Sequence, residues 1–171
     1  NYYKGKLYRW PLVADVGLLY WRKDLMKSPP KTPAELISKS LELKRTGKVK
    51  YGYVWQGKQY EGLSCVFVEV LHAFGGKWLD RSSNVYLNSP EAISAVKWLL
   101  QLLESGASPV AVTNFGESEA LAAFKSGESA FMRNWPYAWA ELKHESSLVK
   151  GKVGVTTMVA TKQEFKTSTL G

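Results

Sequence analysis

The part of this sequence best suited to chemistry is an aromatic stretch near its end, Phe131-Met132-Arg133-Asn134-Trp135-Pro136-Tyr137-Ala138-Trp139. The chain must turn at Pro136, because proline fixes φ and lacks a backbone donor. A strand that ends there and a helix that begins there would place Trp135 and Tyr137 at an element end, where ligand-facing residues tend to lie. Flat aromatic faces beside polar groups suit a sugar ring, whose C–H groups stack on them while its hydroxyls form hydrogen bonds. The alternative is that these aromatics belong to the core, and for Trp139 both interpretations stand.

Asp15 is the only acidic residue between Asn1 and Lys23, in a region of short apolar and aromatic runs. A carboxylate buried there without partners would cost free energy. We therefore expect Asp15 to accept hydrogen bonds. The donors are either a polar ligand or nearby backbone groups, and both roles stay open at this point.

No catalytic motif is present, since the sequence contains no G-x-G-x-x-G, P-loop, G-x-S-x-G or H-E-x-x-H pattern. His72 and His144 are far apart, and neither is close to a candidate nucleophile. A glycosidase needs a paired acid and nucleophile, but no spacing singles out a pair of carboxylates. The carboxylates considered are Asp15, Glu61, Glu69 and Glu117. We therefore favour a binding protein, without catalytic residues, metal or cofactor, over an enzyme.

The chain is basic, with 23 Lys and Arg against 15 Asp and Glu and a net charge of +8. Scattered lysines beside many Trp and Tyr residues would suit phosphate contacts and base stacking, so single-stranded nucleic acid is an alternative partner. No block of five like charges occurs, and we favour a diffusely charged surface instead. No run of about 18 apolar residues is present, so no membrane span is predicted.

The single cysteine, Cys65, excludes an intrachain disulfide and falls in an apolar helical pattern, which predicts a buried structural thiol. Asn1 is not a natural start, and the chain begins and ends abruptly. We interpret residues 1–171 as a single domain, long enough for a core of its own, cut from a longer protein.

The order of the expected elements is typical of an α/β fold. Two helix starts, at Thr32-Pro33-Ala34-Glu35 and Asn88-Ser89-Pro90-Glu91, combine a side-chain cap with proline in the first turn. Apolar periodicity predicts further helices over residues 61 to 74 and 117 to 125, and one from the Trp-Pro-Tyr turn to about His144. Strands are expected in two pieces over residues 6 to 21 with a bend at Pro11, and then over residues 51 to 55, 85 to 87, 129 to 133 and 152 to 158.

Five segments, in order along the chain, carry a family resemblance. They are Gly5-Lys6-Leu7-Tyr8-Arg9-Trp10-Pro11 with Asp15-Val16-Gly17-Leu18-Leu19-Tyr20-Trp21-Arg22-Lys23-Asp24-Leu25, then Pro30-Lys31-Thr32-Pro33-Ala34-Glu35-Leu36, Ser89-Pro90-Glu91-Ala92, Phe124-Lys125-Ser126-Gly127-Glu128-Ser129-Ala130-Phe131-Met132 and Asn134-Trp135-Pro136-Tyr137-Ala138-Trp139. Together they resemble the bacterial extracellular solute-binding proteins of family 1, the sugar-binding receptors of ABC importers. The last segment is most similar to the trehalose/maltose-binding branch. Pro33 departs from the pattern, because the family usually has Trp there.

The resemblance implies a periplasmic-binding-protein-like (type II) lobe, with a mixed sheet and flanking helices. Residues 1–171 would form most of the C-terminal lobe of a two-lobed receptor that closes on a sugar, with crossovers near Asp15 and near Gly171. The N-terminal lobe and the last helices would be absent, so half of the cleft would be missing. The implied partners are an oligosaccharide and the transmembrane subunits of an ABC permease, and the implied location is periplasmic, extracellular or lipid-anchored.

Position by position, the resemblance also implies a ligand-binding set. Asp15 matches a carboxylate that bonds sugar hydroxyls, and Trp135 and Tyr137 match an aromatic turn that stacks on sugar rings. Four further candidates are Trp55, Tyr60 and Glu61, in a loop whose length differs from the family pattern, and Glu117.

The predicted function is therefore to bind a trehalose- or maltose-like oligosaccharide and deliver it to a permease, not to catalyse a reaction. Two alternatives remain. One is a carbohydrate-active enzyme with Asp15 and Glu61 as its acid pair. The other is a single-stranded nucleic-acid-binding domain that uses the scattered lysines and tryptophans.

Overall fold

A mixed four-stranded sheet forms the centre of the chain in the computed structural model, which describes residues 2–10, 12, 15–80 and 82–165. The strands, in spatial order, are β4 (Tyr51–Val54), β5 (Ser129–Asn134), β3 (Leu18–Arg22) and β6 (Val153–Thr156). β3 runs antiparallel to β5 and β6, whereas β4 and β5 are parallel. Every residue of β5 is buried, as expected for a strand with neighbours on both sides and helices on both faces.

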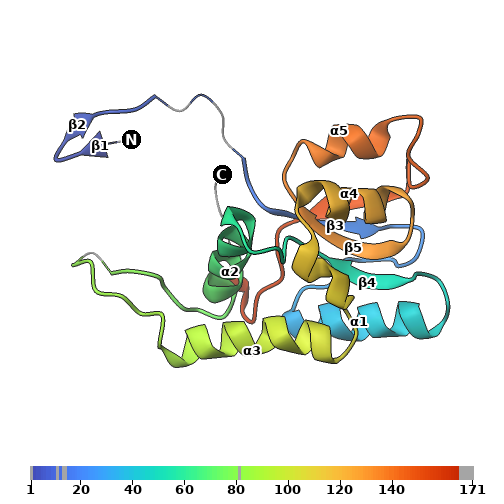
Figure 1. Cartoon of the computed structure of the whole chain (residues 1–171), viewed down its shortest axis with the longest axis horizontal. Coiled ribbons are helices and arrows are strands. Elements are labelled where there is room, and N and C mark those ends of the chain that lie inside the picture. The colour runs from blue at the N-terminus through green and yellow to red at the C-terminus, as the bar shows by residue number, and fades with distance from the viewer. Residues whose placement is uncertain (1, 11, 13–14, 81, 166–171) are drawn as a thin grey trace.

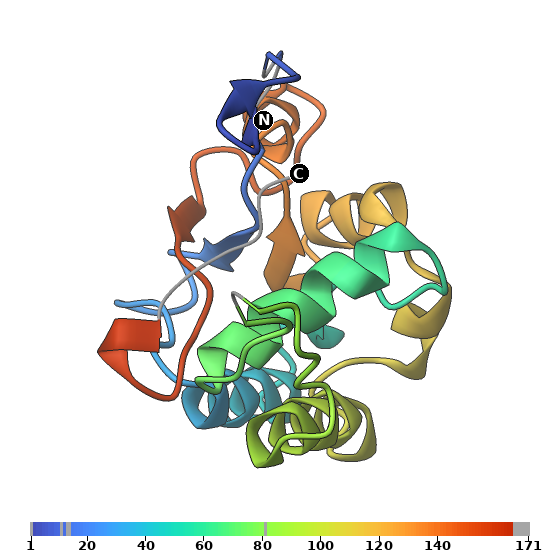
Figure 2. The ribbon, with the colours of Figure 1, turned by 90° about the vertical axis from the view of Figure 1, so that its left-hand side faces the viewer.

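Helices cover both faces of the sheet (Figure 1). α4 (Glu117–Lys125) packs on β5, with the short α5 (Ala138–Lys143) on the same side. α1 (Pro33–Arg45) packs on β4 from the other side, next to α3 (Pro90–Glu104). Figure 2 shows α2 (Glu61–Ala73) in front of the sheet, across the end where β5 finishes and β3 begins.

The two predicted helix starts are confirmed, and each rests on a local hydrogen bond. The hydroxyl of Thr32 accepts from the backbone N–H of Glu35 at 3.2 Å, and Ser89 accepts from Ala92 at 3.2 Å. Proline follows each cap, in the first turn where the missing N–H costs nothing. Such ends depend on neighbouring residues alone, which is why sequence reasoning located them.

Other element predictions were wrong, or fall outside the described residues. Residues 85 to 87 form no strand, only a single bridge between Val85 and Leu79. Cys65 is half-buried rather than buried. The bend at Pro11 and the crossover near Gly171 lie outside the described residues.

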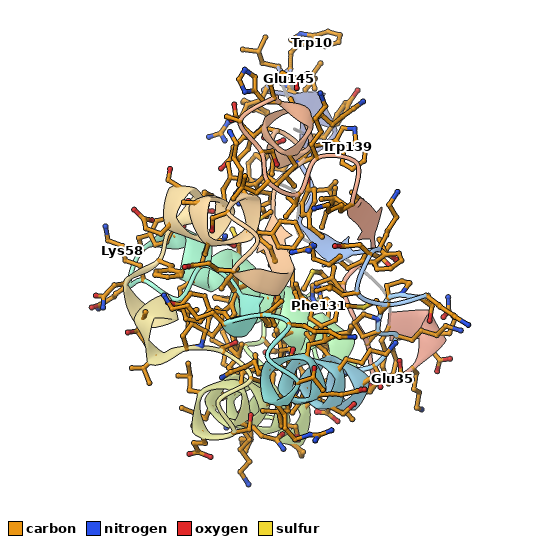
Figure 3. The ribbon with its side chains drawn as sticks, turned by 90° about the vertical axis from the view of Figure 1, so that its right-hand side faces the viewer. Trp10, Glu35, Lys58, Phe131, Trp139 and Glu145 are labelled. Atoms are coloured by element: carbon orange, nitrogen blue, oxygen red, sulfur yellow. The ribbon has the colours of Figure 1, made fainter. Side chains whose placement is uncertain are left out.

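The first piece predicted over residues 6 to 21 is only the short β2 (Lys6–Leu7), paired with β1 (Tyr2–Tyr3). This ribbon projects from the body (Figure 1), and the chain beyond it is exposed as far as Trp10 (Figure 3). Its turn uses Lys4 and Gly5, both with positive φ, the geometry that matches the twist of a two-residue hairpin. Two further segments are 3-10 helices that the sequence did not predict, η1 (Val110–Asn114) and η2 (Gln163–Phe165).

Candidate functional site

The turn that follows β5 is fixed by hydrogen bonds to both backbone groups of its first residue, Trp135. The backbone N–H of Trp135 donates to Oδ1 of Asn134 at 2.9 Å, and its carbonyl accepts from the hydroxyl of Tyr20 at 2.8 Å. Nδ2 of Asn134 donates in turn to the carbonyl of Glu117 at 3.1 Å. Strands β3 and β5 and helix α4 therefore fix the position at which the Trp135 side chain leaves the sheet.

Three predicted site residues from distant parts of the chain meet at this turn. Glu117, the first residue of α4, accepts from the hydroxyl of Tyr60 at 2.6 Å and from the indole Nε1 of Trp135 at 3.0 Å. Desolvation opposes the charged form of Glu117, but the two hydrogen bonds and the nearby charge of Arg133 outweigh it and lower its pKa. Burial and the bond to Glu117 raise the pKa of Tyr60. At neutral pH the cluster therefore combines a carboxylate with a protonated phenol and an indole.

Tyr137 lies beside this cluster and is 45% exposed. Its pKa is raised by partial burial and by the negative charge of Glu117. A protonated hydroxyl and an exposed ring at this position provide both a hydrogen-bonding group and an apolar face.

Asp15 lies at the same end of the sheet. β3 begins at Leu18, opposite Asn134, so the residues just before Leu18 reach the edge where Trp135 follows Asn134. Asp15 is partly exposed there, within the segment that leads into β3. The register thus places Asp15 and Trp135 on neighbouring chain segments.

An ion pair lies against one face of the Trp135 ring. The guanidinium of Arg133 is 3.8 Å from the centre of the Trp135 ring and forms two parallel hydrogen bonds with the carboxylate of Glu69 on α2. Gln56 accepts from Nη1 of Arg133 at 3.2 Å and donates to its backbone carbonyl at 3.0 Å. Sequence reasoning did not assign these three residues to the site. The signal in the sequence that could have identified two of them is a charged residue at a position where the apolar pattern expects an apolar one. Arg133 is such a residue in its strand, and Glu69 is such a residue in its helix.

Two further predicted site residues have other hydrogen-bond partners. Trp55 is 3% exposed and donates its indole N–H to Ser108 at 3.0 Å, so it is a core tryptophan and presents no face to a ligand in this chain. Glu61 is exposed, and its carboxylate accepts from the thiol of Cys65 at 2.9 Å. Burial and that contact raise the pKa of Cys65 to about 11.

In the part of the chain that the structure describes, no group of three or more His, Cys, Asp or Glu side chains is arranged to hold a metal ion. Within the same residues, no helix has both the length and the apolar character needed to cross a membrane.

The fold and the family comparison together place the chain among the solute-binding proteins. Its sequence matches the bacterial extracellular solute-binding proteins over residues 1–164, and the chain belongs to that family. The sequence is 42% identical, over an alignment of 177 residues, to a probable ABC transporter-binding protein of Deinococcus radiodurans, with 98% of this chain and 42% of the relative covered. A maltotriose-binding protein of Pyrococcus abyssi is 27% identical over 143 residues, covering 82% of this chain and 29% of the relative.

Solved structures agree with the sequence relatives. Maltose-bound MalE3 of T. maritima superposes with a TM-score of 0.84 at 41% identity, covering 88% of this chain and 40% of that one. A solute-binding protein of Agrobacterium radiobacter in complex with ribitol gives a TM-score of 0.82 at 29% identity, covering 99% and 43%. The chain thus spans about two-fifths of the length of the Deinococcus relative and of both solved structures, and 29% of the Pyrococcus relative.

These comparisons confirm the predicted type II periplasmic-binding-protein fold. The family consists of solute-binding proteins and not of enzymes, so the prediction of a non-enzymatic protein is confirmed as well.

Proposed function

We propose that residues 1–171 form most of the C-terminal lobe of a two-lobed receptor that binds a maltose- or trehalose-like oligosaccharide for an ABC importer. The relatives support this at the level of class, because they include an ABC transporter-binding protein, a maltotriose-binding protein and a maltose-bound structure. In this proposal the missing lobe supplies the other wall of the cleft, and closure on a hinge traps the sugar.

The observation that carries the proposal is the group of aromatic and carboxylate side chains at one end of the sheet. Arg133 covers one face of the Trp135 ring, so the opposite face is the one left to stack on a sugar. Glu117, Tyr60 and Tyr137 surround that ring with a carboxylate and two hydroxyls. Charged acceptors form hydrogen bonds about twice as strong as neutral ones, which suits recognition of sugar hydroxyls.

Asp15 adds a second carboxylate from the segment before β3, and Glu61 borders the cluster next to Tyr60. Several aromatic faces and carboxylates spread over one edge offer more contacts than a single ring needs. This arrangement favours an oligosaccharide over a monosaccharide. In the whole protein, the receptor would act in the periplasm or at the cell exterior, lipid-anchored or free, and hand its sugar to the transmembrane subunits of a permease.

Isothermal titration calorimetry on the whole protein tests the proposal, with maltose, trehalose, maltotriose, mannitol and ribitol as ligands. The disaccharides should bind more tightly than the sugar alcohols. Trp135→Ala and Asp15→Asn should each weaken binding by roughly 1–3 kcal/mol, from a lost stacking face or a lost charge-assisted bond.

Trp139→Ala is the matched control, because this tryptophan is 40% exposed on α5 and lies under Lys143 rather than at the cluster. Its affinity should equal that of the wild type. Binding that is unchanged in both Trp135→Ala and Asp15→Asn would contradict the proposed site, and a wild-type protein that binds none of the sugars would contradict the function.

A further inference from the structure

The pair formed by Glu69 and Arg133 is unusually deep for two ionised side chains. Their side chains are 1% and 0% exposed, respectively. Nε of Arg133 donates to one carboxylate oxygen at 3.0 Å and Nη2 donates to the other at 2.5 Å, which gives the bidentate geometry that arginine favours. Gln56 provides a further acceptor, so the charges are paired and hydrogen-bonded on several sides.

Stability alone does not explain why such a pair lies here. Removing two charges from water is costly, and well-packed apolar residues in place of a buried ion pair are often at least as stable. The position of the pair suggests another role, because each partner belongs to an element next to the candidate site. Glu69 comes from α2, across the end of the sheet, and Arg133 is one residue from the end of β5.

The pair contacts both of the chain segments that frame the site. Its guanidinium lies 3.8 Å from the ring centre of Trp135, on the face away from any ligand in the proposed function. On another side it meets the backbone of Gly17, two residues after Asp15. A methyl group at Gly17 would overlap the carboxylate of Glu69 and lie 2.6 Å from Nη2 of Arg133. Only glycine allows this close approach.

We propose that Glu69 and Arg133 form a positioning unit of the binding site, which holds the Trp135 ring and the segment carrying Asp15 in their binding arrangement without contacting the sugar. A fixed guanidinium plane stops the indole from rotating away, and its bidentate pairing with Glu69 fixes the guanidinium. Preorganised side chains lose less conformational entropy when they bind. The effects that we expect on sugar affinity rest on the proposed function, whereas the effects that we expect on the position of the Trp135 ring do not.

A matched control exists within the same sheet. Arg22 also makes two hydrogen bonds to a carboxylate, at 2.7 and 2.6 Å to Asp24, but at the opposite end of β3 from the site. Arg22→Lys and Arg133→Lys therefore make the same chemical change, from a planar fork to a point charge, in two places. Only the second should affect the site.

The decisive experiment is a double-mutant cycle on sugar affinity in the whole protein, with maltose as the probe. Arg133→Lys should weaken maltose binding about tenfold, the scale of a desolvated cation–π contact. In a Trp135→Ala background the same change should cost clearly less, because only the contribution through the segment carrying Asp15 then remains. Arg22→Lys should leave the affinity unchanged. If Arg133→Lys does not fold, Glu69→Gln takes its place in the cycle with the same expectation.

A second measurement needs no sugar. In the NMR spectrum of isotope-labelled whole protein, the indole N–H signal of Trp135 is identified by its absence in Trp135→Phe. Arg133→Lys should shift this signal and speed its exchange with solvent, since the ring is then less fixed against Glu117, whereas Arg22→Lys should not.

The outcomes separate the two proposals. An equal loss of affinity from Arg133→Lys with and without the Trp135 ring would show a merely structural role and overturn the inference. An unchanged indole signal in Arg133→Lys would overturn it as well. If the wild type binds no sugar, the proposed function fails, and the indole signal alone decides whether the pair positions Trp135.

Discussion

Glu69→Ala should be one of the most destabilising single substitutions in this fold. It leaves the guanidinium of Arg133, 0% exposed, without the carboxylate that takes two of its hydrogen bonds. Removing one partner of a buried pair costs about 3–5 kcal/mol, because the remaining charge is uncompensated. At roughly 2–4 °C per kcal/mol for a domain of this size, the unfolding midpoint should fall by about 6–20 °C.

The test is scanning calorimetry of the whole protein, with urea unfolding followed by circular dichroism as a second method. Asp24→Ala is the comparison, because it breaks a bidentate pair whose side chains are 10% and 31% exposed. Water can solvate Arg22 once Asp24 is gone, so this loss should stay near 1 kcal/mol.

A double replacement tests whether the loss of stability comes from the charge that is left unpaired. Glu69→Leu combined with Arg133→Met removes both charges and fills similar volume, so it should recover most of the stability that Glu69→Ala loses. An uncompensated buried charge is contradicted if Glu69→Ala costs no more than Asp24→Ala, or if the double variant is as unstable as the single one.

Three further predictions concern local contacts. Because the pKa of Glu117 is lowered in the folded state, its stabilising contribution is present above its unfolded pKa of about 4.3 and is lost as pH falls through the folded pKa. The difference in melting temperature between the wild type and Glu117→Gln should therefore be largest at pH 7 and close to zero at the most acidic pH that the fold tolerates; a constant difference would contradict this. Thr32→Ala removes the N-cap of α1, an acceptor for the backbone N–H of Glu35, and should cost about 1 kcal/mol in urea unfolding, with Thr32→Ser near wild type. Since the pKa of Cys65 is raised to about 11, its alkylation by iodoacetamide at pH 8 should be much slower than that of a free thiol and should accelerate in Glu61→Gln; equal rates would refute the role of Glu61.

Local interactions made several elements predictable. The caps at Thr32 and Ser89, each followed by proline, marked the starts of α1 and α3 within a few neighbouring residues. The predicted helix over residues 117 to 125 coincides with α4 because its apolar face repeats with the helical period. The strand expected over residues 85 to 87 failed because a strand needs a partner, and Val85 bridges only to Leu79.

The sequence by itself determined the class of this protein, since the order of its motifs is carried by the chain and needs no coordinates. It also marked Trp135 and Tyr137, whose position beside Pro136 is a local property. Only the tertiary structure showed that Trp55 belongs to the core, that Glu117 joins Tyr60 and Trp135, and that a buried ion pair lies behind that ring. Glu69 and Arg133 are 64 residues apart, and Tyr60 and Glu117 are 57 apart. Contacts over such separations depend on strand register and helix packing, which no short pattern in the sequence encodes.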